Sequence, residues 1–211
     1  MAGIPFIKND NGIPTFYVDG KPFFACSGEI HNSSSSDLTY MENHVWPQLK
    51  ELNMNSVIVP LYWETIEPTE GEYCFDLLDG LIAQARENGM KLIFLWFGLW
   101  KNAESMYVPE WMKADTATYF RARKVSGEPL NTISPLCEAA VEKDAAAFAK
   151  IMAHIRSIDK QENTVIMMQV ENEIGLLETG RDYSQQAETA FAQDVPAELA
   201  EALGVSGNWK Q

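Results

Sequence analysis

The sequence predicts an α/β fold in which helices cover a parallel β-sheet. Continuous apolar runs of strand length occupy residues 56–63, 91–98 and 165–170, without alternating polar residues. Such runs are typical of strands that are buried on both faces, as they are in parallel sheets. Each run is followed by a segment with helical periodicity, which is the order of repeating βα units.

Composition narrows the class of protein. The 211 residues are 46% hydrophobic, which is enough for the packed core of one domain or of part of a larger one. Sixteen basic and 30 acidic residues give a formal net charge of −14, which repels phosphate backbones and anionic lipid heads. We therefore expect no nucleic-acid partner. We also expect no membrane segment, because no apolar run reaches the ~18 residues of a membrane span.

Two further features concern location and metals. The first twenty residues lack the pattern of a secretory signal, which indicates a cytoplasmic protein if the N-terminus is native; the compartment is otherwise open. Cys26, Cys74 and Cys137 lie far apart, without a CxxC pair or histidines at metal-ligand spacing. We expect free thiols, no metal and no cofactor.

The N-terminal segment is predicted to form a β-hairpin. Residues 15–18 and 21–26 are rich in β-forming residues and join across Asp19-Gly20, which suits a tight primed turn. A short helix is expected within 44–55, because Pro47 suits a first helical turn.

Three later segments are predicted helices. Asp76 can cap a helix in which apolar residues repeat with helical period from Leu77 until Gly89 ends the pattern. Ser134-Pro135 opens the next helix, and a further one covers 185–203. The side chains expected to face inward from the helix after Pro135 are Val141, Ala145, Phe148, Met152, Ile155 and Ile158.

Two architectures fit this order of elements: a doubly wound open sheet and a (β/α)8 barrel. The open sheet expects a glycine-rich phosphate turn after an early strand, and no GxGxxG or GxxxxGKT occurs. A barrel expects aromatic and acidic residues at the carboxyl ends of its strands. Here those ends read GEIH, YWETIEP, WFGLWKNAE and ENE, and the connection 98–134 is unusually long. The sequence therefore favours the barrel.

About four βα units, preceded by the hairpin, can be counted in the chain, whereas a barrel needs eight. We therefore interpret residues 1–211 as the N-terminal half of a (β/α)8 catalytic domain, separated by truncation, cleavage or design from the later strands.

The apolar run VIMMQV is followed directly by Glu171, Asn172 and Glu173. Strict alternation would put the two glutamates on one side of the strand and Asn172 on the other, so a strained or bulged ending is needed to bring Asn172 and Glu173 to one ligand. A carboxyl group held against aromatic walls is favoured in its acid form, as a general acid requires. From the pattern alone, solvated residues of an acidic protein are the more common interpretation.

The segment Gln169-Val170-Glu171-Asn172-Glu173-Ile174-Gly175 resembles the fourth-strand motif Gln-Ile-Glu-Asn-Glu-Tyr-Gly of the family thirty-five β-galactosidases. The resemblance extends over the catalytic barrel from Gly28 to Gly175. It implies that Glu173 is the acid/base and that Asn172 hydrogen-bonds the sugar hydroxyl beside the anomeric carbon.

Three further matches occur in order along the chain. Gly28, Ile30 and His31 fit Gly-x-Ile-His, and Trp63, Glu67 and Pro68 fit Trp-Asn-x-His-Glu-Pro. The third match is to a segment whose Cys-Ala-Glu lines the galactose pocket, and it comprises Gly98, Ala103, Glu104, Pro109 and Trp111. It implies that Glu104 and, by position, Asn102 contact the sugar.

The chain also departs from the family pattern. Pro60 replaces a sugar-binding tyrosine, Glu64 replaces an asparagine, and Asn32-Ser33-Ser34 replaces Tyr-x-Arg. Galactose specificity therefore rests on kinship alone. Glu64 is a candidate substrate-binding residue that either hydrogen-bonds a sugar or caps a loop.

The resemblance implies a retaining glycoside hydrolase that acts on terminal sugars through two carboxylates, without a cofactor. In the family the nucleophile is a glutamate at the end of the seventh strand, so we expect it beyond Gln211 and expect the 211 residues alone to be inactive. The alternative is a non-catalytic carbohydrate-binding or self-assembling half-barrel, because missing strands leave sheet edges unpaired. A homo-oligomer is the form of self-assembly that this alternative suggests.

Overall fold

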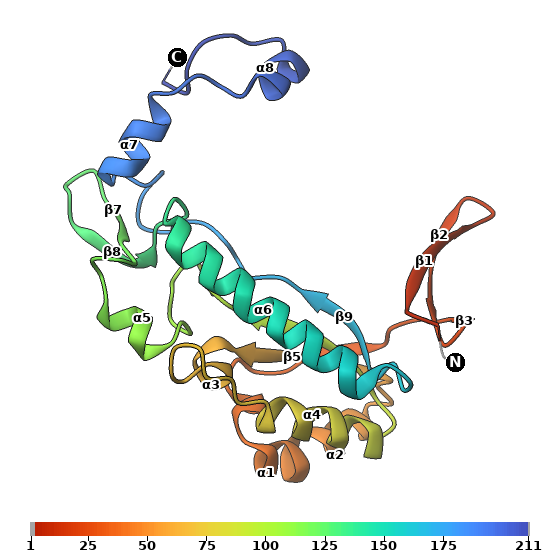
Figure 1. The fold of residues 1–211 in the computed structure, drawn as a ribbon. Coiled ribbons are helices and arrows are strands. Elements are labelled where there is room, and N and C mark those ends of the chain that lie inside the picture. Colours follow the sequence, from red (N-terminus) through yellow and green to blue (C-terminus); the bar gives the residue numbers. More distant parts are fainter. Residues whose placement is uncertain (1–2, 211) are drawn as a thin grey trace.

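A computed structural model describes residues 3–210 as a crescent built around a parallel sheet (Figure 1). The sheet contains β4 (Ser27–Glu29), β5 (Ser56–Tyr62), β6 (Lys91–Phe97) and β9 (Val165–Gln169). These strands lie side by side in the order of the sequence, and every neighbouring pair is parallel. The predicted α/β class with a parallel sheet is confirmed. Successive neighbours without a reversal of strand order are also typical of a barrel rather than a doubly wound sheet.

The N-terminal segment forms a separate antiparallel sheet of β1 (Phe6–Asp10), β2 (Ile13–Val18) and β3 (Lys21–Pro22) at one tip of the crescent (Figure 1). Strands β2 and β3 join across Asp19 and Gly20, whose φ angles of 52° and 73° are those of a primed turn. Strand β1 is absent from the sequence prediction. Its residues FIKND carry few β-forming side chains, and pairing with β2 orders them.

The predicted helix within 44–55 begins earlier in the structure. A short 3-10 turn, η1 (Ser34–Ser36), precedes a continuous helical run of α1 (Leu38–Tyr40), the π-helical η2 (Met41–Val45) and α2 (Trp46–Glu51). Asp37 starts this run, because its carboxylate accepts hydrogen bonds from the backbone N–H groups of Thr39 and Tyr40.

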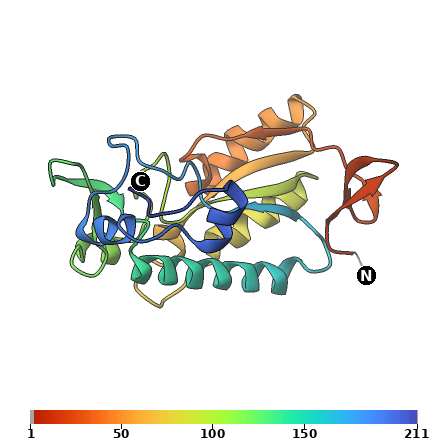
Figure 2. The same ribbon diagram turned by 90° about the horizontal axis from the view of Figure 1, so that it is seen from above.

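One face of the parallel sheet packs against the helices. The short α3 (Trp63–Ile66) follows β5 directly, α4 (Asp76–Glu87) lies beneath the sheet, and α6 (Glu138–Asp159) runs along its side (Figures 1 and 2). The buried core on this face includes Val57, Val59, Leu81, Phe94 and Ile151. The other face carries a smaller buried cluster of Tyr62, Leu95 and Phe97.

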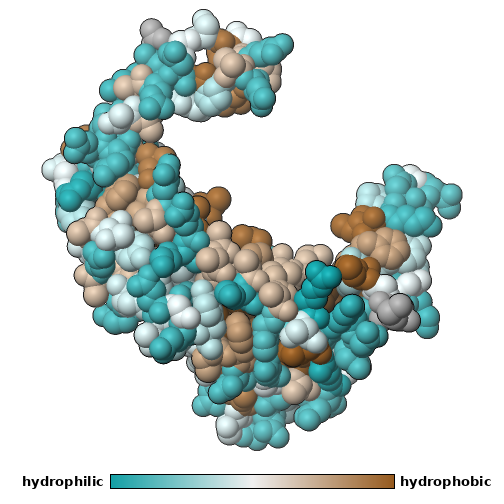
Figure 3. All heavy atoms as spheres, in the orientation of Figure 1, coloured by the Kyte–Doolittle hydropathy of each residue, from teal (hydrophilic) through white to brown (hydrophobic). Residues whose placement is uncertain are grey.

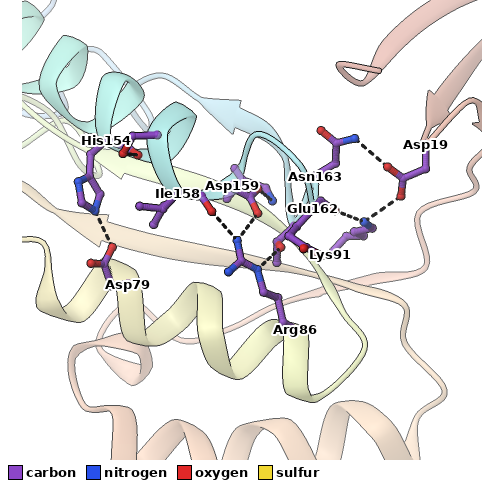
Figure 4. Close-up of polar contacts among 12 residues, drawn as sticks. Asp19, Asp79, Arg86, Lys91, His154, Ile158, Asp159, Glu162 and Asn163 are labelled. Atoms are coloured by element: carbon purple, nitrogen blue, oxygen red, sulfur yellow. Dashed lines mark hydrogen bonds and ion pairs between the residues drawn. The ribbon is translucent and has the colours of Figure 1, made fainter. Parts of the chain in front are cut away.

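Polar contacts join α4, α6 and the N-terminal sheet (Figure 4). His154 Nε2 lies 2.6 Å from Asp79 Oδ1, and the Arg86 guanidinium lies 2.7 Å from the buried Asp159 carboxylate. Asp19 accepts hydrogen bonds from both Lys91 and Asn163, which attaches the N-terminal sheet to the amino ends of β6 and β9.

The inward face predicted for the helix after Pro135 is largely wrong. Four of the six side chains are exposed: Val141, Ala145, Met152 and Ile158. The other two behave as expected, since Ile155 is buried and Phe148 is half-buried. The sheet side of α6 instead presents Ala140, Ala147 and Ile151. The helix carries two apolar stripes, and small alanines allow the closer approach to the sheet.

The predicted helix over 185–203 is two helices, α7 (Gln185–Phe191) and α8 (Ala197–Leu203), at the other tip of the crescent (Figure 1). Pro196 lies between them and has no backbone N–H to continue a helix. The long connection before α6 contains α5 (Glu110–Ala114) and the antiparallel pair β7 (Arg121–Arg123) and β8 (Pro129–Ile133). Within residues 3–210 no helix has both the length and the apolar character needed to cross a bilayer.

Candidate active site

The chain turns sharply where β9 ends. Glu171 and Glu173 have φ angles of 63° and 52°, in the left-handed region that side chains other than glycine seldom adopt. This irregular ending brings Asn172 and Glu173 to one point: Lys101 Nζ lies 2.6 Å from Asn172 Oδ1 and 3.3 Å from Glu173 Oε2. The two side chains can therefore face one ligand. Strict strand alternation would have kept them on opposite sides, so the strained ending is what permits this.

Glu173 lies on the rim of the carboxyl end of the sheet. Its side chain is 62% exposed and lines a hollow of about 540 Å³ together with Asn102 and Ala103. A carboxyl group in this position can reach a ligand that enters from solvent. Asn172 beside it is only partly exposed.

Lys101 is the residue of this site that the sequence did not reveal. Its side chain is only 8% exposed, and its ammonium also lies 5.0 Å from the centre of the Phe97 ring. The detectable signal was a lysine placed just after an apolar strand, where a buried charge needs polar partners.

A tight turn places Asn102 and Glu104 next to this group. Asn102 and Ala103 have φ angles of 53° and 59°, and Lys101 and Glu104 exchange both backbone hydrogen bonds, at 2.8 and 3.0 Å. The Ala103 N–H donates to the backbone carbonyl of Glu173 at 2.9 Å. This bond holds the turn against the segment that follows β9, so Asn102 lines the hollow, while Glu104 is a partly buried residue of the same turn.

Glu64 lies at the carboxyl end of β5 and pairs with a lysine. Its Oε2 is 3.0 Å from Lys113 Nζ on α5, and its backbone N–H donates to the Tyr107 carbonyl. The Tyr107 ring packs against Phe97, with ring centres 5.0 Å apart. Glu64 is thus linked to the Lys101 group through packed aromatic side chains, and the described contacts include none from Glu64 to Asn172 or Glu173.

Glu171 turns away from the rim into the protein. Its two oxygens accept hydrogen bonds from the backbone N–H groups of Leu99, at 3.1 Å, and Trp100, at 2.9 Å. Burial, followed by a hydrogen bond to Asp144 and charge repulsion from it, raises the pKa of Glu171 to about 9. Asp144 in turn accepts a hydrogen bond from Trp96 Nε1 at 2.7 Å. Glu171 therefore carries a proton at neutral pH and joins β9, β6 and α6.

The raised pKa of Glu171 predicts that stability falls with increasing pH. The ordinary value is 4.5, so between about 4.5 and 9 the folded protein holds a proton that the unfolded chain has released. The contribution is complete below pH 4.5 and is lost as the pH rises toward 9. Chemical denaturation across this range measures the slope.

A matched pair of variants on α6 tests the origin of that slope. Asp144→Asn removes the like charge and supplies an amide donor to an ionised Glu171, so we expect a flatter stability profile. The control Glu142→Gln neutralises an exposed carboxylate on the same helix and should keep the wild-type slope. An unchanged slope in Asp144→Asn would contradict this assignment.

The described residues contain no group of three or more histidine, cysteine or acidic side chains that could hold a metal ion. Cys26, Cys74 and Cys137 are free thiols.

Comparisons with known proteins bear on the fold and the family of the chain. The chain is similar to the solved beta-galactosidase from Bacillus circulans sp. alkalophilus, with a TM-score of 0.63 and 18% identity over 86% of this chain and 25% of that one. It is also similar to the exo-beta-1,4-mannosidase Op5Man5 from Opitutaceae bacterium strain TAV5, with a TM-score of 0.50 and 19% identity over 75% of this chain and 26% of that one. The chain thus spans about a quarter of the length of each.

At these identities the two likenesses show the fold alone. The sequence profile of the family described as "Glycosyl hydrolases family 35" matches residues 15–211, which is nearly the whole chain. This chain therefore belongs to glycosyl hydrolase family 35.

Proposed function

We propose that the chain is the acid/base-bearing part of a retaining, β-galactosidase-like glycoside hydrolase that removes terminal sugars. The observation that carries the proposal is the meeting of Asn172 and Glu173 at one ammonium on the carboxyl edge of the sheet. Glycosidases need a carboxyl group of this kind, accessible to the bond that is cleaved.

In the first step Glu173 gives its proton to the oxygen of the leaving group while a second carboxylate attacks the anomeric carbon from ~5 to 5.5 Å away. This step forms a covalent glycosyl-enzyme. In the second step the Glu173 carboxylate takes a proton from water, and the water oxygen replaces the enzyme carboxylate at the anomeric carbon. Asn172 donates from its amide nitrogen to the hydroxyl beside that carbon throughout.

We infer that the nucleophile belongs to a later strand of the barrel, outside these 211 residues. The nearest carboxylate in sequence, Glu171, is unsuited to the role because its oxygens accept backbone hydrogen bonds and it is paired with Asp144. The described half of the barrel would thus supply the proton and part of the sugar pocket. In that pocket Asn102 and Glu104 are the proposed sugar contacts after β6, and Glu64 is the one after β5.

The second candidate function is a carbohydrate-binding or self-assembling module without catalysis. It is favoured by the position of β9 at the edge of the sheet and by two exposed apolar residues, Met167 within that strand and Val170 directly after it. Apolar residues also gather along the concave side of the crescent (Figure 3). Two measurements separate the candidates. Self-association of the 211 residues in a sedimentation experiment, together with a lack of glycosidase activity in the full-length gene product, supports the module.

Hydrolysis of aryl β-galactosides tests the first proposal. Aryl β-mannosides and β-glucosides serve as controls for the sugar. We expect activity from the full-length product of the gene and none from the 211 residues alone, because the proposal places the second carboxylate outside them. If the 211 residues are active and an acidic residue other than Glu173 abolishes that activity, the nucleophile lies within them and our placement is wrong.

A further inference from the structure

The buried ammonium of Lys101 has three distinct partners in the structure. A charge that is 8% exposed must find hydrogen-bond acceptors, because burial without them is costly. Its contacts are the Asn172 amide oxygen at 2.6 Å, a Glu173 oxygen at 3.3 Å and the face of the Phe97 ring at 5.0 Å. An ammonium has three N–H groups, so these contacts can use all of them.

The contact with Asn172 determines which way its amide faces. An amide has one acceptor, the oxygen, and one donor group, the nitrogen. With the oxygen turned to an ammonium, the nitrogen points the other way. The flipped amide would bring its N–H groups against the ammonium, which would set donor against donor and lose a charge-assisted hydrogen bond.

We propose that Lys101 is a positioning residue that orients the Asn172 amide nitrogen toward the sugar and keeps Glu173 beside it. This inference rests on the function proposed above, in which Asn172 must donate to a sugar hydroxyl. Lys101 does not itself touch the reacting atoms. It acts from the loop that follows β6, the strand next to β9 in the sheet.

The backbone of the same turn strengthens this arrangement. Ala103, two residues after Lys101, donates its N–H to the carbonyl of Glu173, and the Asn172 N–H donates to the carbonyl of Trp100, at 3.4 Å. Side chain and backbone therefore hold the same two residues from the same loop. The ion pair with the exposed Glu173 contributes little alone, whereas the short bond to Asn172 is the strong contact.

Paired substrates test the proposal in the full-length gene product. One is an aryl β-galactoside and the other is the same compound without the hydroxyl beside the anomeric carbon. We expect Lys101→Met to lower kcat/KM for the complete sugar about tenfold to a hundredfold, the range of a charge-assisted hydrogen bond, and to affect the deoxy sugar far less. In an Asn172→Ala background, Lys101→Met should cause no further loss of this discrimination.

Equal losses on the two sugars, or additive losses in the double variant, would show that Lys101 only maintains the fold. Lys101→Gln is the second variant, since its shorter neutral side chain cannot hold both partners and leaves a polar group in the same space. It should show the same selective loss.

A measurement without substrate keeps this inference separate from the proposed function. In an atomic-resolution crystal structure of Lys101→Met, we expect the Asn172 side chain to leave the rotamer it adopts beside the ammonium. An unchanged Asn172 and Glu173 would overturn the positioning role, whatever the activity. A displaced Asn172 in a protein that hydrolyses no glycoside would instead uphold positioning and reject the proposed function.

Discussion

Glu173→Gln should reduce turnover of substrates with poor leaving groups by roughly 10²- to 10⁴-fold, the usual contribution of general acid–base catalysis. Glutamine keeps the shape of the side chain on the rim but cannot transfer a proton. A substrate with a highly acidic phenol needs little protonation, so its bond should still break at a rate close to that of the wild type. The loss should therefore grow as the leaving group becomes more basic.

The second half of the reaction offers an independent readout. Without a base, water attacks the glycosyl-enzyme slowly, whereas azide needs no base and should restore turnover of the activated substrate by forming a β-glycosyl azide. The matched control is Glu178→Gln, which removes another carboxylate of the segment after β9, paired with Lys124 at 2.6 Å, and should leave the kinetics unchanged. Equal losses across leaving groups, without azide rescue, would exclude Glu173 as the acid/base.

Gly98→Ala should destabilise the protein by about 2 to 4 kcal/mol, through overpacking and the disruption of buried hydrogen bonds. An added Cβ would lie 2.4 Å from Trp96 Nε1, 2.5 Å from Asp144 Oδ1 and 2.6 Å from Glu171 Oε1. Real Cβ atoms do not approach so closely, and these three atoms already belong to one hydrogen-bonded group. Glycine is therefore required here for space around the Glu171–Asp144 pair.

Thermal and denaturant unfolding measure this effect, with Gly180→Ala as the matched control. An added Cβ at Gly180 meets no atom within 4 Å, so that variant should change stability by less than ~0.5 kcal/mol. Because Glu171 binds the backbone of Leu99 and Trp100, Gly98→Ala should also lower activity by moving the loop that carries Lys101. Wild-type stability in Gly98→Ala would mean that the pair tolerates displacement and does not hold this loop.

Local patterns predicted the elements that bear the site. The apolar runs of β5, β6 and β9 are long, unbroken and rich in β-forming residues, so their period and length were sufficient. Local patterns were insufficient for α6, where two apolar stripes compete, and for the two helices that Pro196 separates. In α6 the short distance between helix and sheet favours burial of the alanine-rich stripe. That distance cannot be inferred from the residues of the helix alone.

The sequence by itself determined the α/β class and the family, and it singled out Asn172 and Glu173 as candidates, because a motif and a strand period are both properties of adjacent residues. Only the tertiary structure decided that Glu171 turns inward to Asp144 while Glu173 stays on the rim, and that Lys101 joins Asn172 to Glu173. These outcomes depend on φ angles at the end of β9 and on the adjacency of β6 and β9. The groups concerned lie on separate elements, and folding alone brings them within hydrogen-bond distance.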